Sequence, residues 1–306
     1  MNNRRVIGIG ECVLDIIFKE DQPQKAVPGG SVFNCMVSLG RMGVTAYFVS
    51  ELGEDYVGQR IRRFMLENRL CPDYIDFYSD GQSPLSLAVL DSNQNASYDF
   101  YRRFPRNRMQ ITLPEITPGD ILIIGSYFAV NPEVRPAVKQ LLEEAKAKGA
   151  IIYYDINFRR AHIGELDQLR PSILENFAYA DIIRCSDEDL EVLSGSSSPE
   201  YFDRLLNEKA IIITRGSKNV SLHTPSFQQD YPINAIVPVS TIGAGDNFNA
   251  GLIYALTQTD ITKAELSRLK EPRWSVLIGI ANRFASAVCL SYDNYVGQDF
   301  IESWQQ

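Results

Sequence analysis

Two glycines and an aspartate stand where an apolar segment gives way to a helical pattern. The segment 236–239 reads IVPV and predicts a strand, and the apolar positions that follow Asp246 fall on one helical face. Glycine permits positive φ and close approach of a ligand, and the unpaired N–H groups of a first helical turn attract an anion such as phosphate. We therefore expect the backbone of Gly243, Ala244 and Gly245 to form an anion hole.

Asp246 lies in the same first turn, where the positive end of the helix would keep its carboxylate ionised. A carboxylate at this place would repel a phosphate, so its useful role is to accept a proton from a hydroxyl that attacks the phosphate. The turn therefore predicts phosphoryl transfer. The alternative is structural: the glycines make a tight turn, and Asp246 only favours the helix N-terminus.

Charge and composition limit the possible functions. The 306 residues carry 30 Lys and Arg against 38 Asp and Glu, and the net charge of −8 disfavours nucleic acid and anionic membranes as partners. No stretch approaches the roughly 18 apolar residues of a membrane helix. His162 and His223 lie far apart and indicate neither a metal site nor a triad. The five scattered cysteines lack a C-x-x-C pair and favour a reducing, cytoplasmic location.

Two familiar nucleotide-binding patterns are not found. There is no G-x-x-x-x-G-K-[ST] loop, and GIGECV has Val13 where a dinucleotide fingerprint needs a third glycine. An NAD-dependent oxidoreductase, a rival class on a similar α/β sheet, is therefore poorly supported.

Buried strand patterns alternate with helical patterns along the chain. Residues 57–65 and 134–145 have apolar residues at helical spacing, and the second run stops at Gly149. This alternation predicts one α/β domain over residues 1–306, with a mostly parallel sheet between helices. The expected strands are RRVIGIG at 4–10, TAYFVS at 45–50, DILIIG at 120–125, AIIYYD at 150–155, DIIR at 181–184 and AIIIT at 210–214.

Two regions, roughly 12–28 and 71–108, interrupt this rhythm with short alternating patterns. LSLAVLD, the turn-like DSNQNAS and SYDFYRR together predict a hairpin. We expect these regions to form a small antiparallel sheet that acts as a lid over a site on the main sheet. The alternative is an edge hairpin without a role in the site.

Two segments resemble the signatures of the ribokinase-like carbohydrate kinases, the PfkB family. STIGAGDNFNAG at 240–251 is similar to the carboxy-terminal signature D-T-x-G-A-G-D-x-F-x-x-G, and VPGGSVFNCMVSLGRMGV at 27–44 is similar to the amino-terminal one. The two signatures lie about 200 residues apart with the expected alternation of strands and helices between them, so the resemblance covers essentially the whole chain. The resemblance implies a three-layer sandwich with a mostly parallel central sheet and a small β-sheet lid. It also implies transfer of the ATP γ-phosphate to a primary hydroxyl of a small sugar.

The resemblance also suggests sugar-binding residues. Asp15 follows the apolar run VIGIGECVL, where a charged residue should face a ligand or leave the sheet. Gly29 and Gly30 would bring the backbone close to the sugar, and Asn34, off the apolar face of its helix, would offer a donor and an acceptor to its hydroxyls. SYDFYRR and DINFR resemble family segments that place Tyr101, Arg102 and Arg159 at the substrate.

Other segments resemble the nucleotide and cation regions of the family. Thr214 and Gly216 match a T-x-G that borders the nucleotide, and Thr241 stands in the glycine signature. In SDEDLEVLSG, Asp189 takes the position of a glutamate that helps hold Mg²⁺, and an acidic helix start is the alternative reading. Ser240 replaces the aspartate that helps bind a monovalent cation in many relatives, so potassium activation is in doubt.

The choice of sugar stays open at this stage. SDEDLEVLSG and SYDFYRR are similar to fructokinase segments, so fructose is the leading substrate and 2-keto-3-deoxygluconate is the next. A nucleoside kinase and a non-catalytic sugar-binding regulator are further alternatives, although retention of Asp246 argues against the regulator because binding alone needs no base. Apolar lid positions, including Leu85, Leu87 and Val89, suggest a homodimer through the lid.

Overall fold

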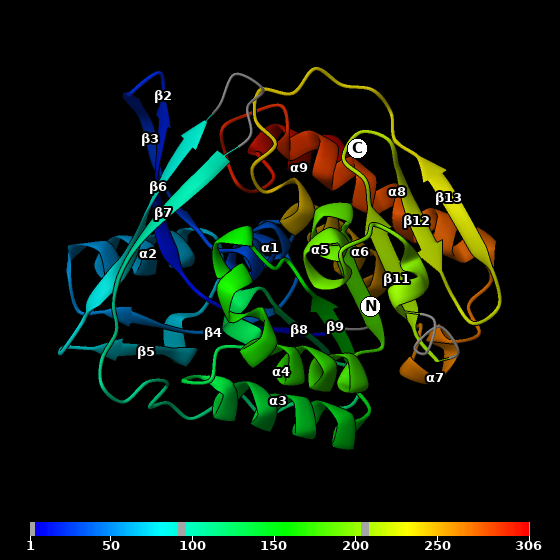
Figure 1. Ribbon diagram of the computed structural model, residues 1–306, viewed down its shortest axis with the longest axis horizontal. Helices are drawn as coiled ribbons and strands as arrows, with labels where there is room; N and C mark the ends of the chain where they lie inside the picture. Colours follow the sequence, from blue (N-terminus) through cyan, green and yellow to red (C-terminus); the bar gives the residue numbers. More distant parts are fainter. Residues whose placement is uncertain (1–3, 91–95, 203–207, 306) are drawn as a thin grey trace.

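A large twisted sheet forms the centre of the computed structural model, which describes residues 4–90, 96–202 and 208–305 (Figure 1). Within these residues the sheet has nine strands in the order β13-β12-β11-β10-β9-β8-β1-β4-β5. The pairs from β11 through to β5 are parallel, and β12 and β13 add an antiparallel edge. The strands are β1 (Val6–Ile9), β4 (Ala46–Gly53), β5 (Ile75–Tyr78), β8 (Ile121–Gly125), β9 (Ile151–Asp155), β10 (Ile182–Ser186), β11 (Ala210–Thr214), β12 (Asn219–His223) and β13 (Gln228–Pro232).

Both faces of this sheet are covered, because side chains of each central strand point alternately into two apolar clusters. In β8, Ile121 and Ile123 belong to one cluster, and Leu122 and Ile124 belong to the other. This confirms the expected three layers of helix, sheet and helix. The first cluster packs against α1 (Ser31–Arg41), α2 (Tyr56–Glu67), α6 (Ala244–Thr257) and α8 (Glu271–Val288), and the second packs against α3 (Arg135–Lys148), α4 (Leu166–Tyr179) and α5 (Asp187–Ser194).

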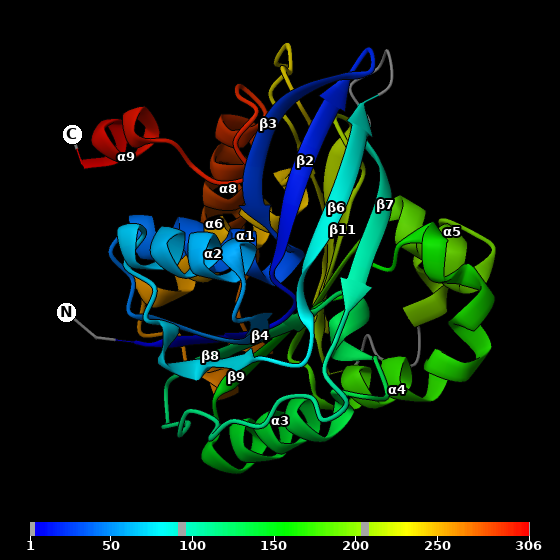
Figure 2. The same ribbon diagram turned by 90° about the vertical axis from the view of Figure 1, so that its left-hand side faces the viewer.

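A second sheet of four strands rises from one edge of the main sheet (Figure 2). Its order is β3-β2-β6-β7, from β2 (Val13–Lys19), β3 (Gln22–Gly29), β6 (Gln82–Leu90) and β7 (Ala96–Arg103), and we call it the lid sheet. The β2/β6 pair is parallel, and the two outer pairs are antiparallel. Because β2 follows β1 almost directly in the sequence, the lid sheet stands over the ends of the central strands.

The range 71–108 predicted for the lid is too wide. The strand β5 (Ile75–Tyr78) pairs in parallel with β4 and so belongs to the main sheet, and residues 104–108 form no strand. A short apolar run has the same pattern whether it belongs to the main sheet or to the lid sheet. The pattern therefore could not show which strand β5 pairs with. Of the predicted turn DSNQNAS, residues 91–95 lie outside the described residues.

The strand predicted at 236–239 is wrong. These residues form no strand, and the side chain of Val237 is 88% exposed. The segment crosses the surface after β13 has ended, and Pro238 has no N–H to donate to a neighbouring strand. Val239 donates its N–H to the carbonyl of Cys289 (2.8 Å), which fixes the chain just before the glycine turn.

The remaining elements are short. None of the helices in the described ranges has the length and apolar character that crossing a membrane would require. The 3₁₀ helices are η1 (Pro72–Tyr74), η2 (Tyr127–Ala129), η3 (Arg160–Glu165) and η4 (Pro199–Phe202), and the last α-helices are α7 (Lys263–Leu266) and α9 (Gln298–Gln305).

Candidate active site

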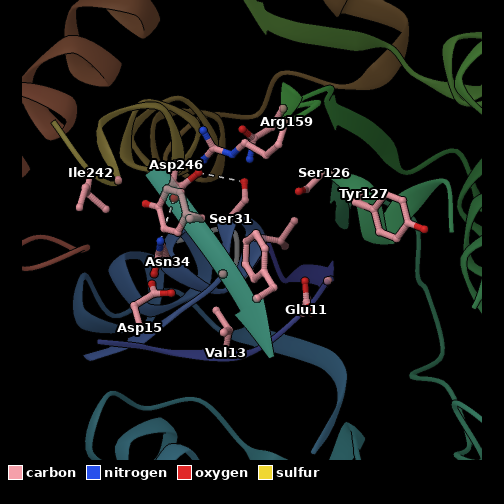
Figure 3. A pocket seen from close by; sticks show the side chains of 18 of the residues that line it. Glu11, Val13, Asp15, Ser31, Asn34, Ser126, Tyr127, Arg159, Ile242 and Asp246 are labelled. Carbon is pink, nitrogen blue, oxygen red and sulfur yellow. Dashed lines mark hydrogen bonds between the residues drawn. The ribbon is translucent and has the colours of Figure 1, made fainter. Parts of the chain in front are cut away.

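A pocket lies between the ends of the central strands, the first turns of α1 and α6, and the inner face of the lid sheet (Figure 3). It brings together residues that are more than 200 positions apart in the chain. The predicted site residues that line it are Asp15, Gly30, Asn34, Arg102, Arg159, Gly243 and Asp246. Others that line it, which the sequence analysis did not identify, include Glu11, Ser31, Tyr98, Phe100, Tyr127 and His162.

The glycine turn opens helix α6, as its spacing predicted. Gly243 is the N-cap with φ of 78°, and a Cβ atom there would lie 2.8 Å from the carbonyl oxygen of Asn294. Gly245 lies in the first helical turn, where its N–H has no helical partner. The N–H of Ala244 donates to the carbonyl of Thr241 (3.3 Å), so this amide is less available for an anion than we expected.

Asp246 is buried at the floor of the pocket and is held from two sides. Its Oδ1 atom accepts a hydrogen bond from the hydroxyl of Ser31 (2.9 Å), and its Oδ2 atom accepts one from the Nδ2 of Asn34 (2.8 Å). Burial raises the pKa of this carboxyl, although both hydrogen bonds act in the opposite direction. Desolvation, the largest influence on this pKa, therefore acts against the ionised form that the helix end was expected to favour. A raised pKa makes the ionised group a better proton acceptor.

Asp15 lies across Asn34 from Asp246 (Figure 3). Its carboxylate accepts hydrogen bonds from the hydroxyl of Ser86 on β6 and from the Nδ2 of Asn294 (3.3 Å). Burial raises the pKa of Asp15 to about 7, and the nearby negative charge of Asp246 adds to this effect. A carboxylate that is desolvated in this way is stabilised when it accepts a hydrogen bond from a hydroxyl group of a ligand.

The glycines before α1 allow the backbone to pass very close to these acids. A Cβ atom at Gly29 would overlap the Oδ2 atom of Asp15, and one at Gly30 would overlap the carbonyl oxygen of Glu11. Gly30 also has φ of 125°, which side chains disfavour. Asn34, one turn into α1, keeps a buried Oδ1 atom that has no hydrogen-bond partner among the described residues. That oxygen is available to a donor on a ligand.

The lid strand β7 presents alternate residues to the pocket. Tyr98, Phe100 and Arg102 line it, whereas Tyr101 is 58% exposed on the outer face. Tyr101 was predicted at the substrate, and the structure does not place it there, because neighbours in a strand point to opposite faces. The same alternation, counted from Arg102, would have identified Phe100 and Tyr98.

Arg102 is not a free donor. Its guanidinium binds both oxygens of Glu11, with Nε to Oε1 at 2.7 Å and NH2 to Oε2 at 2.8 Å, and it lies 4.2 Å from the ring centre of Phe100. The pair joins the lid strand to the end of β1. Arg159, on the loop after β9, lies 5.7 Å from the ring centre of Tyr98 and faces the pocket beside Asp246 (Figure 3).

The predicted nucleotide residues lie outside this pocket. Thr214 ends β11 and accepts a hydrogen bond from the NH2 of Arg184 (2.6 Å). Gly216 has φ of 53° in the turn between β11 and β12, and Thr241 is an exposed residue two positions before the glycine turn. Thr214 and Gly216 lie at and just after the carboxyl end of β11, and their contact with a nucleotide stays a prediction.

Asp189 uses both carboxylate oxygens within the chain, and its part in holding Mg²⁺ stays a prediction. Its Oδ2 atom accepts hydrogen bonds from the N–H and the hydroxyl of Ser186 (both 2.7 Å), and its Oδ1 atom accepts one from the N–H of Phe158 (2.7 Å). These contacts make a capping box at the start of α5, which uses both oxygens. Nowhere in the described ranges do three or more His, Cys, Asp or Glu side chains gather as a metal site would require.

A buried arginine beneath the glycine turn was missed. Arg184 on β10 binds Asp155 (3.1 Å), and its guanidinium would lie 2.8 Å from a Cβ atom at Gly245. Asp155 also accepts a hydrogen bond from the Nδ2 of Asn249 on α6 (2.8 Å). The charged end of the run DIIR, in a strand that is otherwise apolar, was the signal for this residue. Its positive charge lies directly against the predicted anion hole.

The titration of Asp15 predicts a pH-dependent gain in stability for Asp15→Asn. Between its ordinary pKa of 3.8 and about 7, the folded protein binds this proton more tightly than the unfolded chain does, so its contribution to the unfolding free energy falls as the pH rises. Asparagine does not titrate, so the variant lacks this fall in the unfolding free energy. The variant should gain about 2–3 kcal/mol over the wild type between pH 5 and pH 8. Urea unfolding of both proteins at the two pH values measures this difference. If the free energy of unfolding changed equally with pH in both proteins, the raised pKa of Asp15 would be contradicted.

The fold and the site together define a class: a phosphotransferase that acts on a small hydroxyl compound. A family model described as pfkB family carbohydrate kinase matches residues 3–296. The chain therefore belongs to the pfkB family of carbohydrate kinases, which confirms the resemblance of its two signatures.

Curated relatives include fructokinase-2 of Solanum habrochaites, which is 26% identical over 282 residues, covering 87% of this chain and 86% of the relative. Fructokinase-1 of Oryza sativa subsp. japonica is 26% identical over 284 residues, covering 87% of each chain.

Solved structures agree on the fold. A fructokinase from Vibrio cholerae O395, crystallised with fructose, ADP and calcium ion, has a TM-score of 0.85 at 22% identity, with 100% of each chain covered. An aminoimidazole riboside kinase from Salmonella enterica, complexed with aminoimidazole riboside and an ATP analogue, has a TM-score of 0.83 at 20% identity, with 99% of this chain and 100% of that chain covered.

Proposed function

We propose that this carbohydrate kinase transfers the γ-phosphate of ATP to a primary hydroxyl of fructose. The observation that carries the proposal is the position of Asp246, a buried carboxyl with raised pKa, at the glycine turn and within the same pocket as Asp15 and Asn34. The curated fructokinases that resemble the chain over 87% of its length support fructose as the acceptor.

In this mechanism the chain's own residues divide the work. Asp246 takes the proton of the attacking hydroxyl, while Ser31 and Asn34 fix the orientation of its carboxylate. The first turn of α6 and the charge of Arg184 stabilise the negative charge on the transferred phosphoryl group. Asp15 accepts hydrogen bonds from the other hydroxyls of the sugar. The lid sheet excludes water, which would otherwise compete as the acceptor.

Metal ions enter the proposal only with the nucleotide. Because Asp189 is used by its capping box, the described residues offer no cluster that would hold Mg²⁺ by themselves, and we treat the nucleotide substrate as MgATP. Ser240 is buried, and its hydroxyl accepts a hydrogen bond from the N–H of Ile242 (3.2 Å). A hydroxyl is a weaker cation ligand than a carboxylate, so the proposal includes no monovalent cation.

The charges in the pocket favour a neutral sugar over a sugar acid such as 2-keto-3-deoxygluconate. Glu11 accepts hydrogen bonds from both Nε and NH2 of Arg102, which leaves Arg159 as the cation of the pocket lining that acts on Asp15 and Asp246. A carboxylate on the substrate would add a further negative charge to a pocket in which burial already raises the pKa of both aspartates. A nucleoside is neutral and stays the second candidate.

The acceptor can be tested with a panel of fructose, 2-keto-3-deoxygluconate, ribose and adenosine, with ADP formation as the readout. We expect fructose to give kcat/KM at least about 100-fold above the sugar acid, which corresponds to about 3 kcal/mol. Glu11→Gln should narrow this ratio, because it frees the Arg102 guanidinium for an anionic substrate. Faster turnover of the sugar acid by the wild type would overturn the substrate assignment.

We also propose that the outer face of the lid sheet pairs two subunits. Register places Leu85 beside Tyr101, and Leu87 beside Ile16, on this face, and Val89 is 40% exposed there. A two-fold axis would bury the same patch on both copies. Leu87→Asp should raise the dimer dissociation constant by about 100-fold or more, since it desolvates a charge at the contact. Sedimentation velocity measures this, and a wild-type monomer at micromolar concentration would rule the pairing out.

The proposed compartment is the reducing cytoplasm. All five cysteines are free thiols, and four of them are buried. None of them is within a disulfide, as expected for a chain that folds under reducing conditions.

A further inference from the structure

A groove on the far side of β3 from the sugar pocket is lined by residues of β3, α1 and α2. Figure 2 shows where these three elements lie. The segment 293–295 closes its remaining side. Four cationic side chains line the groove, Lys25, Arg41, Arg60 and Arg63, against the two acids Glu67 and Asp293. The whole chain has a net charge of −8, so a local excess of positive charge is a specific property of this surface.

Two of these guanidinium groups are held by neutral acceptors. Arg41 donates to the side-chain oxygen of Asn68 and to the carbonyl of Val296 (2.7 Å). Arg60 donates to the carbonyl of Ala26 (2.7 Å) on β3. These contacts fix the positions of both groups without neutralising their charge.

The charge of the groove is largely uncompensated. Among the described residues, no carboxylate lies within 4.0 Å of Arg41, Arg60 or Arg63, whereas Lys25 is paired with Asp293. Burial lowers the pKa of Arg41, and the opposing effects of Tyr295 and Asp293 are smaller. The position of Arg41 in the last turn of α1 suits the helix dipole, but it does not remove the cost of a desolvated cation.

The groove also has a flat apolar wall. The guanidinium of Arg41 lies 4.5 Å from the ring centre of Tyr295, and Phe64 packs beside that ring at 5.1 Å between centres. Stacking on an aromatic ring keeps the donor fork of an arginine rigid. A rigid fork with nearby second and third cations matches the oxygen geometry of a phosphate group.

We propose that this groove binds a small anion that carries a phosphate group, at a site separate from the catalytic pocket. Arg63 is exposed and supplies the outer contact, while Arg41 and Arg60 supply the fixed inner ones. Both inorganic phosphate and a phosphorylated sugar present this chemistry.

The groove shares its wall with the sugar pocket. Pro28 and Tyr295 line the groove, and their chain neighbours Gly29 and Asn294 contact the carboxylate of Asp15. Asn294 also accepts a hydrogen bond at its carbonyl from the Nδ2 of Asn247 in α6 (2.8 Å). An anion that orders these two segments therefore changes the affinity for the sugar, and by linkage the sugar changes the affinity for the anion.

Calorimetric titration of the full chain with inorganic phosphate, and separately with fructose 6-phosphate, tests the site. Each titration is run with and without a saturating non-hydrolysable ATP analogue, because phosphate at the anion hole competes with the analogue and phosphate in the groove does not. We expect one site that persists with the analogue present. Arg63→Gln should weaken it about tenfold, and Arg63→Glu should weaken it further. The matched control Arg273→Glu changes an arginine on α8, whose side chain is 56% exposed, and should leave binding unchanged.

Thermal unfolding first establishes that the Arg63 variants are folded, as expected for an exposed side chain. The absence of non-competitive binding to the wild type at millimolar phosphate, or equal affinity in Arg63→Glu, would overturn the site. If only the phosphorylated sugar binds, the ligand is a sugar phosphate and not free phosphate. The coupling rests on the proposed function and is read from the KM for fructose with and without the anion. The binding result needs no turnover, so the two proposals can fail separately.

Discussion

Replacing Asp246 by asparagine should lower the turnover of sugar and ATP by about three to four orders of magnitude, while both substrates still bind. The carboxylate is the proposed proton acceptor for the attacking hydroxyl, and a positioned base of this kind contributes about 10²–10⁴-fold to a rate. The first turn of α6 and the charge of Arg184 are unchanged in the variant, so stabilisation of the phosphoryl group is retained.

The substitution should not disturb the fold. Asp246 accepts one hydrogen bond from Asn34, which must donate there, and another from Ser31, whose hydroxyl can rotate and accept instead. The asparagine amide can therefore place its oxygen toward Asn34 and its NH₂ group toward Ser31. A loss of activity would then report the missing base and not a collapsed pocket.

The measurement is kcat by coupled ADP detection, with fructose and ATP-analogue affinities by calorimetry. Asp260→Asn is the matched control, because that side chain is 86% exposed at the surface. In the wild type, kcat/KM should fall on the acid side at a pH above the ordinary carboxyl range, since burial raises the pKa of Asp246 and the base must be ionised. Undiminished turnover in Asp246→Asn would remove Asp246 from the mechanism.

The layers of the fold could be predicted from the sequence because they depend on local patterns. The runs at 121–124 and 151–154 are apolar at every position, as strands buried on both faces must be, and both lie in strands of the main sheet. The stop of α3 at Gly149 was also local, since that residue adopts φ of 73° after the last helical turn. The run 236–239 is also apolar but has no neighbouring strand, and Pro238 is its only local signal against a strand.

The candidate site could be predicted only where one element determines it. The glycine turn and Asp246 lie within four residues, so their arrangement follows from one helix start. In contrast, the ion pair between Glu11 and Arg102 joins positions 91 residues apart. Arg102, which was predicted to bind the sugar, is engaged by Glu11 instead. The surroundings of Asp189 could not be predicted either, because Ser-x-x-Asp is equally a capping box, and only the contact from Phe158 shows that both of its oxygens are used.

Gly29→Ala should raise the KM for the sugar by about 100-fold or more, which is about 3 kcal/mol of lost binding, with little effect on nucleotide affinity. A methyl group at this position would overlap the Oδ2 atom of Asp15, so the carboxylate must leave the place where it accepts hydrogen bonds from Ser86 and Asn294. The overlapped atom is the far end of a side chain, which moves more easily than the backbone of Gly29, paired with Val13 in the lid sheet. The carboxylate is therefore the group that yields.

This prediction separates the sugar site from the phosphate site. Gly243 and Asp246 stand at the start of α6, whereas the atoms nearest to the added methyl group belong to Asp15 and Asn294. ATP-analogue binding should therefore stay within about twofold of the wild type, a difference below about 0.5 kcal/mol. Gly279→Ala is the matched control: its Cβ atom would meet nothing within 4 Å on α8, and the helix should gain about 0.5–1 kcal/mol. Steady-state kinetics and calorimetry measure both effects. An unchanged sugar KM in Gly29→Ala would mean that Asp15 does not hold the sugar, because the substitution displaces that carboxylate wherever the substrate binds.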